Sequence, residues 1–557
     1  MCYHNTIGES CRCKLKQRDL AAQQVIRRGD KMKVLVMDGV SEEGLAPLRR
    51  YSEIEVVIGK KMTEDELAEV IPEYDGMIVR SATKVTAKVF EKAERLQVVG
   101  RAGVGVDNID LEAATRKGVL VVNAPDGNTI AATEHSIAMI LSMARNIPQA
   151  VGKMKEGVWE KKAFLGVEVR GKALGVVGLG RIGSAVAKRA HALEMDIIAY
   201  DPFITEEKAQ SMAIELVSFE DLCKRADFIT IHMPKTKESY HMFNQQAFSL
   251  MKKGVRIVNC ARGGIIDEEA LYQAMVEGKV AGAALDVFEK EPDTESPLIA
   301  LPNFIATPHL GASTEEAQLN VAVDVSEEIV SALTGNVVKN TVNIPPINPK
   351  TLSVVRPYLA LAEKLGRFHA YLATGRVNKV EIICRGDLSK EEAAHITTSA
   401  VKGLLDPILQ ETVNFVNAPL LAKNRGIQVL QSLDAQSDGY DHLITIKVRT
   451  DKEERSLSGT LFGEHDLRIV MVDGYRMDVV PGDHMFYIPH MDKPRVIGAV
   501  CTLVGKYDIN IASMQVGRKE AGGKAIMMLS VDEEAPAGIL EELAGIEGVL
   551  EVKMIKF

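Results

Sequence analysis

Short apolar runs alternate with segments of helical periodicity from Met32 to about residue 342. The first group of runs contains Lys33–Asp38, Glu55–Ile58, Gly76–Ser81, Gln97–Gly103 and Val119–Pro125. Near-continuous apolar runs separated by helices are typical of parallel strands that are covered on both faces. We therefore predict a first α/β unit built on a parallel sheet.

A long amphipathic segment, Thr129–Arg145, leads from this unit to a second series of apolar runs. A second long helix, Glu315–Thr334, ends the series and precedes a stretch with three prolines, Val342–Lys350, which marks a boundary. The rhythm of strands and helices between them is typical of a doubly wound dinucleotide-binding fold. The six predicted strands are Ala173–Val177, Asp196–Tyr200, Asp227–His232, Val255–Cys260, Val280–Val287 and Phe304–Thr307.

The remainder of the chain differs in character. Residues 351 to about 480 mix helices and strands without the strand–helix–strand rhythm, which predicts an α+β domain. From about Met485 the pattern reads βαββαβ, with helices over 494–506 and 536–544, the order of a ferredoxin-like sandwich. We therefore predict a disordered extension (1–31), a flavodoxin-like domain (32–128 and 313–342), a doubly wound parallel-sheet domain (129–312), an intervening α+β domain (343–482) and a ferredoxin-like terminal domain (483–557).

Length and charge narrow the classes of function. At roughly 150 residues per domain, 557 residues predict three or four domains. The formal charge of −9, from 67 basic and 76 acidic side chains, gives no field that would attract nucleic acid or an anionic membrane surface. No apolar run reaches the roughly 18 residues of a transmembrane helix. We expect neither a nucleic-acid nor a membrane partner.

The cysteines indicate a reducing compartment. There are seven, an odd number, and most stand alone within apolar segments, so we expect no disulfide framework and a cytoplasmic protein. Residues 1–31 are polar and basic and lack the apolar core of a signal peptide. Their Cys2, His4, Cys11 and Cys13 match no trusted zinc spacing, so we expect no metal site.

A glycine-rich turn follows the first strand of the second series. Gly178, Gly180 and Gly183 form a GxGxxG motif after the strand and open the next helix. The first glycine permits a tight turn, the second lets the backbone approach a pyrophosphate, and the third lets the helix pack against the sheet. The free N–H groups of the helix N-terminus favour a phosphate, so we predict a dinucleotide cofactor.

Asp201 selects between the two nicotinamide cofactors. It ends the next predicted strand, where a carboxylate can accept hydrogen bonds from both ribose hydroxyls of the adenosine half. It would repel a 2′-phosphate, and the following residues DPFITEE offer no cation to offset it. We predict NAD rather than NADP.

Three later strands are followed by polar residues that suit hydride transfer to or from a 2-hydroxy acid. His309 can take the hydroxyl proton, Glu291 can orient this histidine, and Arg262 can hold the substrate carboxylate. Such sheets bind ligands at the carboxyl ends of their strands, which favours this joint role. Taken singly, each has a structural alternative: a packed histidine after a proline, or a solvated EKEP turn.

The chain resembles a known family over Met32 to about Val342, where it contains RSATKVT, GRAGVGVDNID, GLGRIG, NCARGGIID, ALDVFEKEP and PHLGAST. These runs are similar to the signatures of D-isomer-specific 2-hydroxyacid dehydrogenases, and among them of the long-form phosphoglycerate dehydrogenases. The resemblance implies NAD-dependent oxidation of D-3-phosphoglycerate to 3-phosphohydroxypyruvate, the first step of phosphorylated L-serine biosynthesis. It gives Arg262, Glu291 and His309 the same three roles as the residues themselves suggest.

The resemblance also implies the cofactor contacts. Val104 stands where some relatives have Thr, so a side-chain hydrogen bond is lost there. The implied contacts are Val104, Arg181, Ile182, Asp201, Met233, Cys260, Ala261, Arg262, Asp286, and 309–312 with Gly311 and Ala312.

By the same resemblance, the first sheet and the returning helix form a substrate-binding domain. Arg80, Ser81 and the turn around Gly103 would face the substrate, and Arg80 is the candidate for a bidentate grip on a phosphate. Residues 129–157 would carry the contacts of a homodimer or homotetramer. Lys161 or Lys162 would reach a neighbour's substrate, although a solvated charge pair is an equal alternative.

The second half resembles the intervening domain of the long-form enzymes and, over 485–557, an ACT domain. By analogy this domain pairs with another copy and binds serine as an effector, with His490, Asp492 and Asn510 as candidate contacts. Arg495 replaces a common glycine and puts close backbone approach of the ligand in doubt. The alternative is an ACT domain that serves oligomerisation alone.

Two rival functions stay open at this point. The first is a broader 2-hydroxyacid dehydrogenase, for example one that reduces 2-oxoglutarate. The second is a non-catalytic scaffold that senses a nucleotide and uses this fold to bind protein partners. The ACT-like domain and the absence of a basic patch argue against the scaffold.

Overall fold

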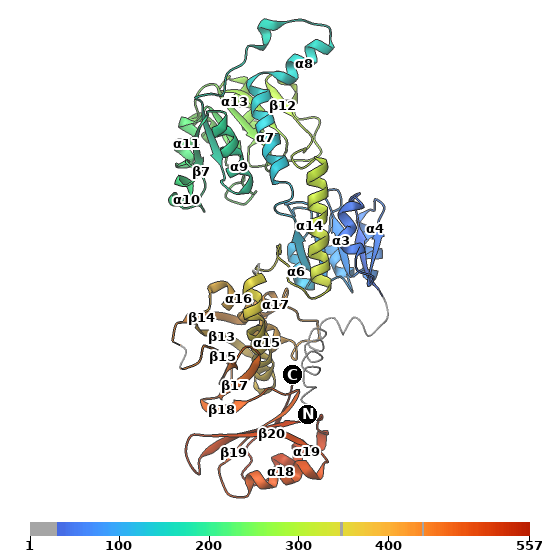
Figure 1. Cartoon of the computed structure of the whole chain (residues 1–557), viewed down its shortest axis with the longest axis vertical. Coiled ribbons are helices and arrows are strands. Elements are labelled where there is room, and N and C mark those ends of the chain that lie inside the picture. The colour runs from blue at the N-terminus through green and yellow to red at the C-terminus, as the bar shows by residue number, and fades with distance from the viewer. Residues whose placement is uncertain (1–30, 346–348, 437–438) are drawn as a thin grey trace, which may run out of the picture.

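The described residues form four β-sheets that follow one another along an elongated molecule (Figure 1). The structure, a computed structural model, describes residues 31–345, 349–436 and 439–557. Residues 1–30, which contain nearly all of the predicted N-terminal extension and its cysteines, lie outside the described residues. The order of sheets confirms the predicted fold class.

The first sheet is parallel and has the strand order β2-β1-β3-β4-β5, the flavodoxin-like order. On one face lie α4 (Glu64–Val70), α5 (Ala87–Lys92) and α6 (Leu111–Lys117), and on the other lies the long helix α14 (Glu315–Leu333). Apolar residues on both faces of the strands explain this double cover. The strands are β1 (Met32–Val36), β2 (Ile54–Ile58), β3 (Gly76–Val79), β4 (Val98–Arg101) and β5 (Leu120–Asn123).

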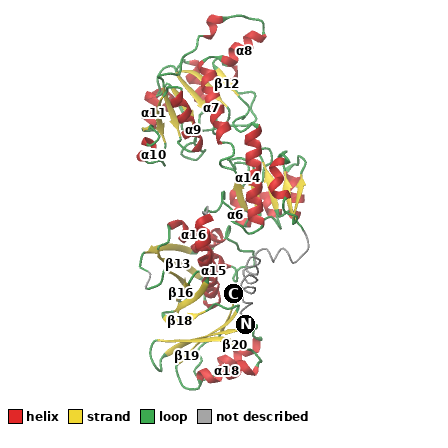
Figure 2. Cartoon of the chain, viewed as in Figure 1, coloured by secondary structure: helices red, strands yellow, loops and turns green. Residues whose placement is uncertain are grey.

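The second sheet is also parallel, with the order β12-β11-β10-β9-β6-β7-β8, the doubly wound dinucleotide-binding order with one further strand. Helices α7 (Thr129–Ala144) and α9 (Arg181–Ala192) cover one face, and α11 (Phe219–Arg225), α12 (Gln245–Leu250) and α13 (Glu268–Val276) cover the other (Figure 2). The strands are β6 (Ala173–Val177), β7 (Asp196–Tyr200), β8 (Glu215–Leu216), β9 (Phe228–Ile231), β10 (Val255–Asn259), β11 (Val280–Leu285) and β12 (Phe304–Ala306).

The sequence pattern missed one strand of this sheet. We predicted six strands, and the structure has a seventh, β8, at the edge beside β7. This strand has only two residues, Glu215 and Leu216, and neither is buried. A run this short and this exposed leaves no apolar pattern to detect.

An arm projects from the second sheet at the top of Figure 1. It contains α8 (Ile147–Lys155) and a short 3-10 helix, Lys161–Phe164, and no residue of either helix is buried. Several large apolar side chains of the arm are exposed, above all Trp159 at 83 % and Leu165 at 89 %. Apolar exposure on this scale is typical of a surface that another molecule covers.

The third sheet is mixed and has the order β14-β13-β15-β16-β17-β18. Only β13 and β14 pair in parallel. The helices are α15 (Pro349–Leu372), α16 (Lys390–Leu405) and α17 (Ala418–Asn424), and the strands are β13 (Val377–Gly386), β14 (Gln428–Asp434), β15 (His442–Thr450), β16 (Glu454–Phe462), β17 (Asp466–Val472) and β18 (Tyr475–Val479).

The fourth sheet is antiparallel with the order β20-β21-β19-β22, which confirms the ferredoxin-like prediction. Helices α18 (Val496–Lys506) and α19 (Ala537–Ala544) pack on one face. The predicted first helix began at Pro494, but the observed helix begins after Arg495, whose φ of +78° is not helical. The strands are β19 (His484–Met491), β20 (Ile511–Arg518), β21 (Lys524–Val531) and β22 (Lys553–Lys556).

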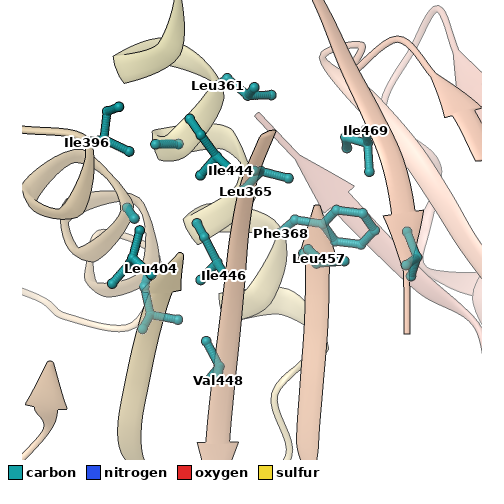
Figure 3. Packing of buried hydrophobic residues seen from close by; sticks show 14 of the residues in the cluster. Leu361, Leu365, Phe368, Ile396, Leu404, Ile444, Ile446, Val448, Leu457 and Ile469 are labelled. Carbon is teal, nitrogen blue, oxygen red and sulfur yellow. The ribbon is translucent and has the colours of Figure 1, made fainter. Parts of the chain in front are cut away.

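The third and fourth sheets share one hydrophobic core. Figure 3 shows Leu361, Leu365 and Phe368 of α15 packed against the third sheet. The same cluster continues into the fourth sheet through Met485, Tyr487, Ile526, Met528 and Ile555. The ring of Phe368 meets those of Tyr487 and Phe557 edge to face, with centroids 6.1 and 6.3 Å apart.

Arg455 also joins these two sheets. From β16 its Nη1 donates to the Tyr487 hydroxyl of β19 at 3.1 Å and to Asp473 at 3.2 Å. Its Nη2 lies 3.6 Å from Glu551, which precedes β22. Burial opposes the charge of Arg455, but these neighbours outweigh it and raise its pKa.

Candidate active site

The glycine-rich turn has the geometry that its three glycines predict. Gly178 follows β6 with a φ of +96°, and a Cβ there would stand 2.5 Å from the carbonyl oxygen of His232. A Cβ on Gly183 would stand 1.9 Å from the carbonyl oxygen of Gly178, so α9 can approach the strand only without a side chain. A Cβ on Gly180 would meet nothing within 4 Å.

This open space and the N-terminus of α9 fit a dinucleotide. Helix α9 begins at Arg181 with Gly180 as its N-cap residue and no side-chain cap, which leaves backbone N–H groups for phosphate oxygens. Asp201 follows β7 and accepts the N–H of Leu179 at 2.7 Å and that of Phe203 at 2.8 Å. Its carboxylate therefore lies beside the glycine turn, where an adenosine ribose can meet it.

Asp286 organises the loop that carries His309. It follows β11, is fully buried, and accepts the Thr307 hydroxyl and the N–H groups of Leu310 and Gly311 at 2.6 to 2.8 Å. His135 of α7 approaches the same carboxylate at 3.2 Å. Burial works against ionisation, but these donors outweigh it and lower the pKa of Asp286.

His309 and Glu291 form a pair. Nδ1 of His309 lies 2.8 Å from Oε2 of Glu291, and Oε1 of Glu291 accepts the N–H of Phe288 at 3.0 Å. Partial burial disfavours the carboxylate, but the hydrogen bonds from His309 and Phe288 outweigh it and lower the pKa of Glu291. An ionised carboxylate only accepts hydrogen bonds, so Nδ1 donates and Nε2 is left as the acceptor nitrogen.

Arg262 reaches from the second sheet to the first domain. The Asn259 side chain shapes the turn after β10: it accepts the N–H of Ala261 and donates to the Arg262 carbonyl, both at 2.9 Å. Nε of Arg262 donates to Asp107 at 3.1 Å. Asp107 belongs to the GRAGVGVDNID run, so the two domains meet at this guanidinium.

The predicted substrate residues of the first domain follow the carboxyl ends of β3 and β4. Arg80 follows β3, its N–H donates to Asp38 at 2.8 Å, and its carbonyl accepts from Asn108 at 2.7 Å. Ser81 is exposed beside it. Gly103 has a φ of +149° and follows β4, and its carbonyl accepts the N–H of Ala124 at 3.0 Å.

The remaining predicted cofactor residues surround the glycine turn and the catalytic loops. The backbone nitrogen of Met233 lies 3.2 Å from where a Cβ on Gly178 would stand. Burial raises the pKa of the Cys260 thiol to about 12, and the Asp286 charge adds to this effect. Ile182 in the first turn of α9 and Ala312 in the loop after His309 are half-buried, and the carbonyl of Val104 accepts from Asn123 at 2.6 Å. Lys161 lies apart from this group, on the exposed arm.

The three predicted effector residues do not meet one open pocket. Asp492 already accepts from Arg518 at 3.0 Å and from the Gly522 N–H at 3.3 Å, and the Arg518 hydrogen bond leads the lowering of its pKa. Asn510 donates to Asp532 at 2.6 Å. Asn510 immediately precedes β20. His490 is fully buried, and its Nε2 has no partner in the described part of the chain.

Three further residues of the site were missed by the sequence analysis. They are Asp107, which binds Arg262; Asp126, whose carboxylate pairs with Arg181 at 2.6 Å; and His135, which approaches Asp286. Asp107 and Asp126 each follow a predicted strand, a signal that could have found them. His135 lies within α7, where spacing alone gives no signal.

Three stretches of the chain match models of known protein families. Residues 137–311 match the model of the D-isomer specific 2-hydroxyacid dehydrogenase, NAD binding domain. Residues 354–473 match the D-3-phosphoglycerate dehydrogenase intervening domain, and 490–548 match the ACT domain. The cofactor is therefore NAD, as the sequence predicted. Within the described residues, no helix is both long and apolar enough to cross a membrane.

Two curated relatives are similar over nearly the whole chain. The D-3-phosphoglycerate dehydrogenase of Methanocaldococcus jannaschii is 48% identical over 525 residues, 94% of this chain and 99% of that protein. That of Bacillus subtilis is 46% identical over 524 residues, again 94% and 99%. A solved structure of D-lactate dehydrogenase from Aquifex aeolicus, complexed with NAD and lactic acid, is 29% identical with a TM-score of 0.50. It covers 56% of this chain and 99% of that one.

Proposed function

The chain belongs to the D-3-phosphoglycerate dehydrogenase family, and from that premise we propose that it oxidises D-3-phosphoglycerate to 3-phosphohydroxypyruvate. This reaction opens the phosphorylated route to L-serine. The observation that carries the proposal is the 2.8 Å pair of His309 and Glu291 beside Arg262 at the strand ends of an NAD-binding domain.

NAD supplies the acceptor for the hydride when it is bound. The chain's own residues handle the proton and the charge. Since Nδ1 of His309 donates to Glu291, its Nε2 is the atom that takes the proton of the substrate hydroxyl. Glu291 holds the imidazole in this tautomer and stabilises the positive charge that His309 gains.

Arg262 binds the substrate carboxylate in this proposal. Its Nε donates to Asp107, and Nη1 donates to the carbonyl of Ala261 at 2.6 Å, so the side chain is oriented before substrate arrives. Nη2 has no hydrogen bond among the described residues and is free to donate to a carboxylate. A guanidinium held in this way can bind the carboxylate in a fixed orientation and so position the carbon that loses the hydride.

The test is the rate of NADH formation with D-3-phosphoglycerate, run beside NADH oxidation with 2-oxoglutarate. The proposal expects the phosphoglycerate reaction to dominate. A larger kcat/KM with 2-oxoglutarate would favour the broader dehydrogenase. Tight NADH binding with no turnover of either substrate would favour the scaffold.

We propose that the arm of α8 makes a homodimer in the cytoplasm. Its exposed apolar side chains, led by Trp159 and Leu165, fit a second copy of the same surface. Lys161 lies on this arm and would reach the partner's substrate. All cysteines in the described ranges are free, which fits a reducing compartment. Light scattering of the wild type and of Trp159→Lys tests the dimer, which the variant should dissociate.

We propose that the ACT domain binds L-serine as a feedback effector at Asp492, and that His490 and Asn510, which do not share one pocket with it, are not both direct contacts of the ligand. Asp492 would exchange its Arg518 partner for the ligand's ammonium group. A serine titration of the rate tests this, with Asp492→Ala expected to abolish inhibition. An unchanged inhibition constant in that variant would place the effector elsewhere.

A further inference from the structure

Arg101 is a partly buried cation beside the proposed substrate site. It ends β4 and precedes the turn that contains Gly103 and Gly105. Its guanidinium occupies the side-chain space of Gly103, because a Cβ at position 103 would stand 1.5 Å from its Nη1. Its Nε is buried and has no hydrogen-bond partner in the described structure.

Gly105, in the same turn, makes room for the guanidinium of Arg262. A Cβ on Gly105 would stand 2.0 Å from Nη2 of Arg262. Glycines 103 and 105 therefore make room for two guanidinium groups, one from each catalytic domain. A larger residue at either position would displace a cation.

Among the described residues, Arg101 lacks a direct counter-charge, because the carboxylates of Asp107 and Asp38 raise its pKa through their charge without contacting it. Among the described residues, no carboxylate forms an ion pair or hydrogen bond with it, since Asp107 is bound to Arg262 and Asp38 to Arg80 and Thr83. Burial, followed by the charges of Arg262 and Arg80, lowers the pKa of Arg101 to about 10. A partly buried guanidinium whose buried Nε has no hydrogen-bond partner is unfavourable, so an anion from outside the chain would complete its contacts.

We propose that Arg101 is a substrate-binding residue that, with Arg80 and Arg262, forms one site for a ligand with two anionic groups, a phosphorylated 2-hydroxy acid. This inference rests on the proposed function and adds what selects its substrate. A carboxylate and a phosphate together bring about −2.5 to −3 charges at neutral pH, which three guanidinium groups match. An unphosphorylated 2-hydroxy acid brings one.

The test compares the full-length wild type with Arg101→Met, Arg101→Lys and the control Arg116→Met. Arg116 is an exposed cation of the same domain, paired with Glu112 on α6. The steady-state constants for D-3-phosphoglycerate, D-glycerate and NAD are measured, with inorganic phosphate as a competitive inhibitor. Melting temperatures report on folding.

Arg101→Met should raise the KM for D-3-phosphoglycerate about 30-fold or more and weaken inhibition by inorganic phosphate to a similar degree. The KM for NAD and the kcat/KM for D-glycerate should stay within about threefold. Arg101→Lys should give a KM for D-3-phosphoglycerate between those of the wild type and Arg101→Met, because lysine keeps the charge but lacks the planar guanidinium group that binds a phosphate through two hydrogen bonds. Arg116→Met should resemble the wild type.

Two outcomes would overturn the assignment. One is a KM for D-3-phosphoglycerate within threefold of the wild type in Arg101→Met. The other is an equal loss with both substrates and a lower melting temperature, the result of a role limited to supporting the turn. If the methionine variant does not fold, the lysine variant is judged by the same criteria.

A failure of the proposed function would look different. The wild type would then form no NADH from D-3-phosphoglycerate. Stabilisation of its NADH complex by inorganic phosphate, followed as a shift in melting temperature, would still report on Arg101. Loss of that shift in Arg101→Met or Arg101→Lys supports the anion site, and an unchanged shift overturns it.

Discussion

Asp286 is the residue that ties the proton-transfer group to the NAD-binding domain. Its carboxylate holds the backbone on the C-terminal side of His309, and its own carbonyl accepts the His309 N–H at 3.0 Å. His309 has a φ of +56°, an uncommon conformation for a residue with a side chain. The hydrogen bonds of Asp286 maintain this conformation and so direct the imidazole toward Glu291.

We expect Asp286→Asn to destabilise the protein by about 1–3 kcal/mol at neutral pH, because an amide cannot accept all of these hydrogen bonds. The pKa of Asp286 is lowered by folding, so its contribution is present above the ordinary value of 3.8 and is lost as the pH falls through the lowered value. The melting temperatures of variant and wild type should therefore converge in acid. Asp196→Asn, an exposed position, is the control, and a gap independent of pH would contradict the expectation.

Glu291→Gln should distinguish two roles of Glu291: orienting the imidazole of His309 and stabilising its positive charge. The amide oxygen can still accept from Nδ1 of His309, but the negative charge that stabilises the protonated imidazole is gone. We expect kcat to fall by roughly 10²-fold with the KM for NAD unchanged. Steady-state kinetics test this, with exposed Glu295→Gln as the control. A kcat within threefold of the wild type would remove Glu291 from the mechanism.

Residues that follow predicted strands could be placed from the sequence, because parallel strands end at the same edge of a sheet. Arg262, Glu291 and His309 belong to this group. Arg101 was not predicted, because the role proposed for it rests on the lack of an ion-paired carboxylate among the described residues, which is a property of the three-dimensional structure. No spacing along the chain reveals such an absence.

At the scale of elements, the close packing of α9 against β6 requires glycine in the turn that joins them. The helix approaches until Gly183 lies against the carbonyl of Gly178, a contact that any side chain would prevent. The long elements were accurate from periodicity to within about a residue, as α7 and α14 show. Strand β8 and the start of α18 were not, because one is two residues long and the other depends on the backbone angle of Arg495.

Gly183→Ala should move α9 away from the sheet. The added methyl would overpack the turn, at a cost of about 1–3 kcal/mol, and displace the N–H groups that face the cofactor. We expect the Kd for NADH, measured by fluorescence, to rise more than tenfold. Gly505→Ala in α18 meets open space and should leave binding unchanged. Equal affinities would show that the contact can relax.

At the scale of the whole molecule, the second half has fewer independent parts than its sequence suggests. The sequence predicted an intervening and a terminal domain from two different patterns. The structure gives each its own sheet, but one hydrophobic cluster that contains Phe368 is shared between them, beside a separate core between the fourth sheet and its helices. Periodicity in α15 identifies buried positions without showing which element covers them, so the sharing of this core could not be predicted.

Phe368→Ala should destabilise both sheets together. Truncation of a fully buried phenylalanine costs about 3–5 kcal/mol, and its ring contacts Tyr487 and Phe557 as well as the third sheet. Hydrogen exchange should therefore accelerate in β15 and in β21 to a similar degree. The exposed Phe462→Ala is the control. Faster exchange in the third sheet alone would indicate two separable cores.

The shared core also bears on how such a chain can diversify. Recombination that joined a foreign ACT module near residue 482 would divide a hydrophobic cluster and leave Tyr487 and Phe368 without their partners. A crossover that carries the whole of residues 349–557 would keep the cluster intact. We therefore expect the two domains to be exchanged together rather than singly, because only the pair keeps the shared cluster whole.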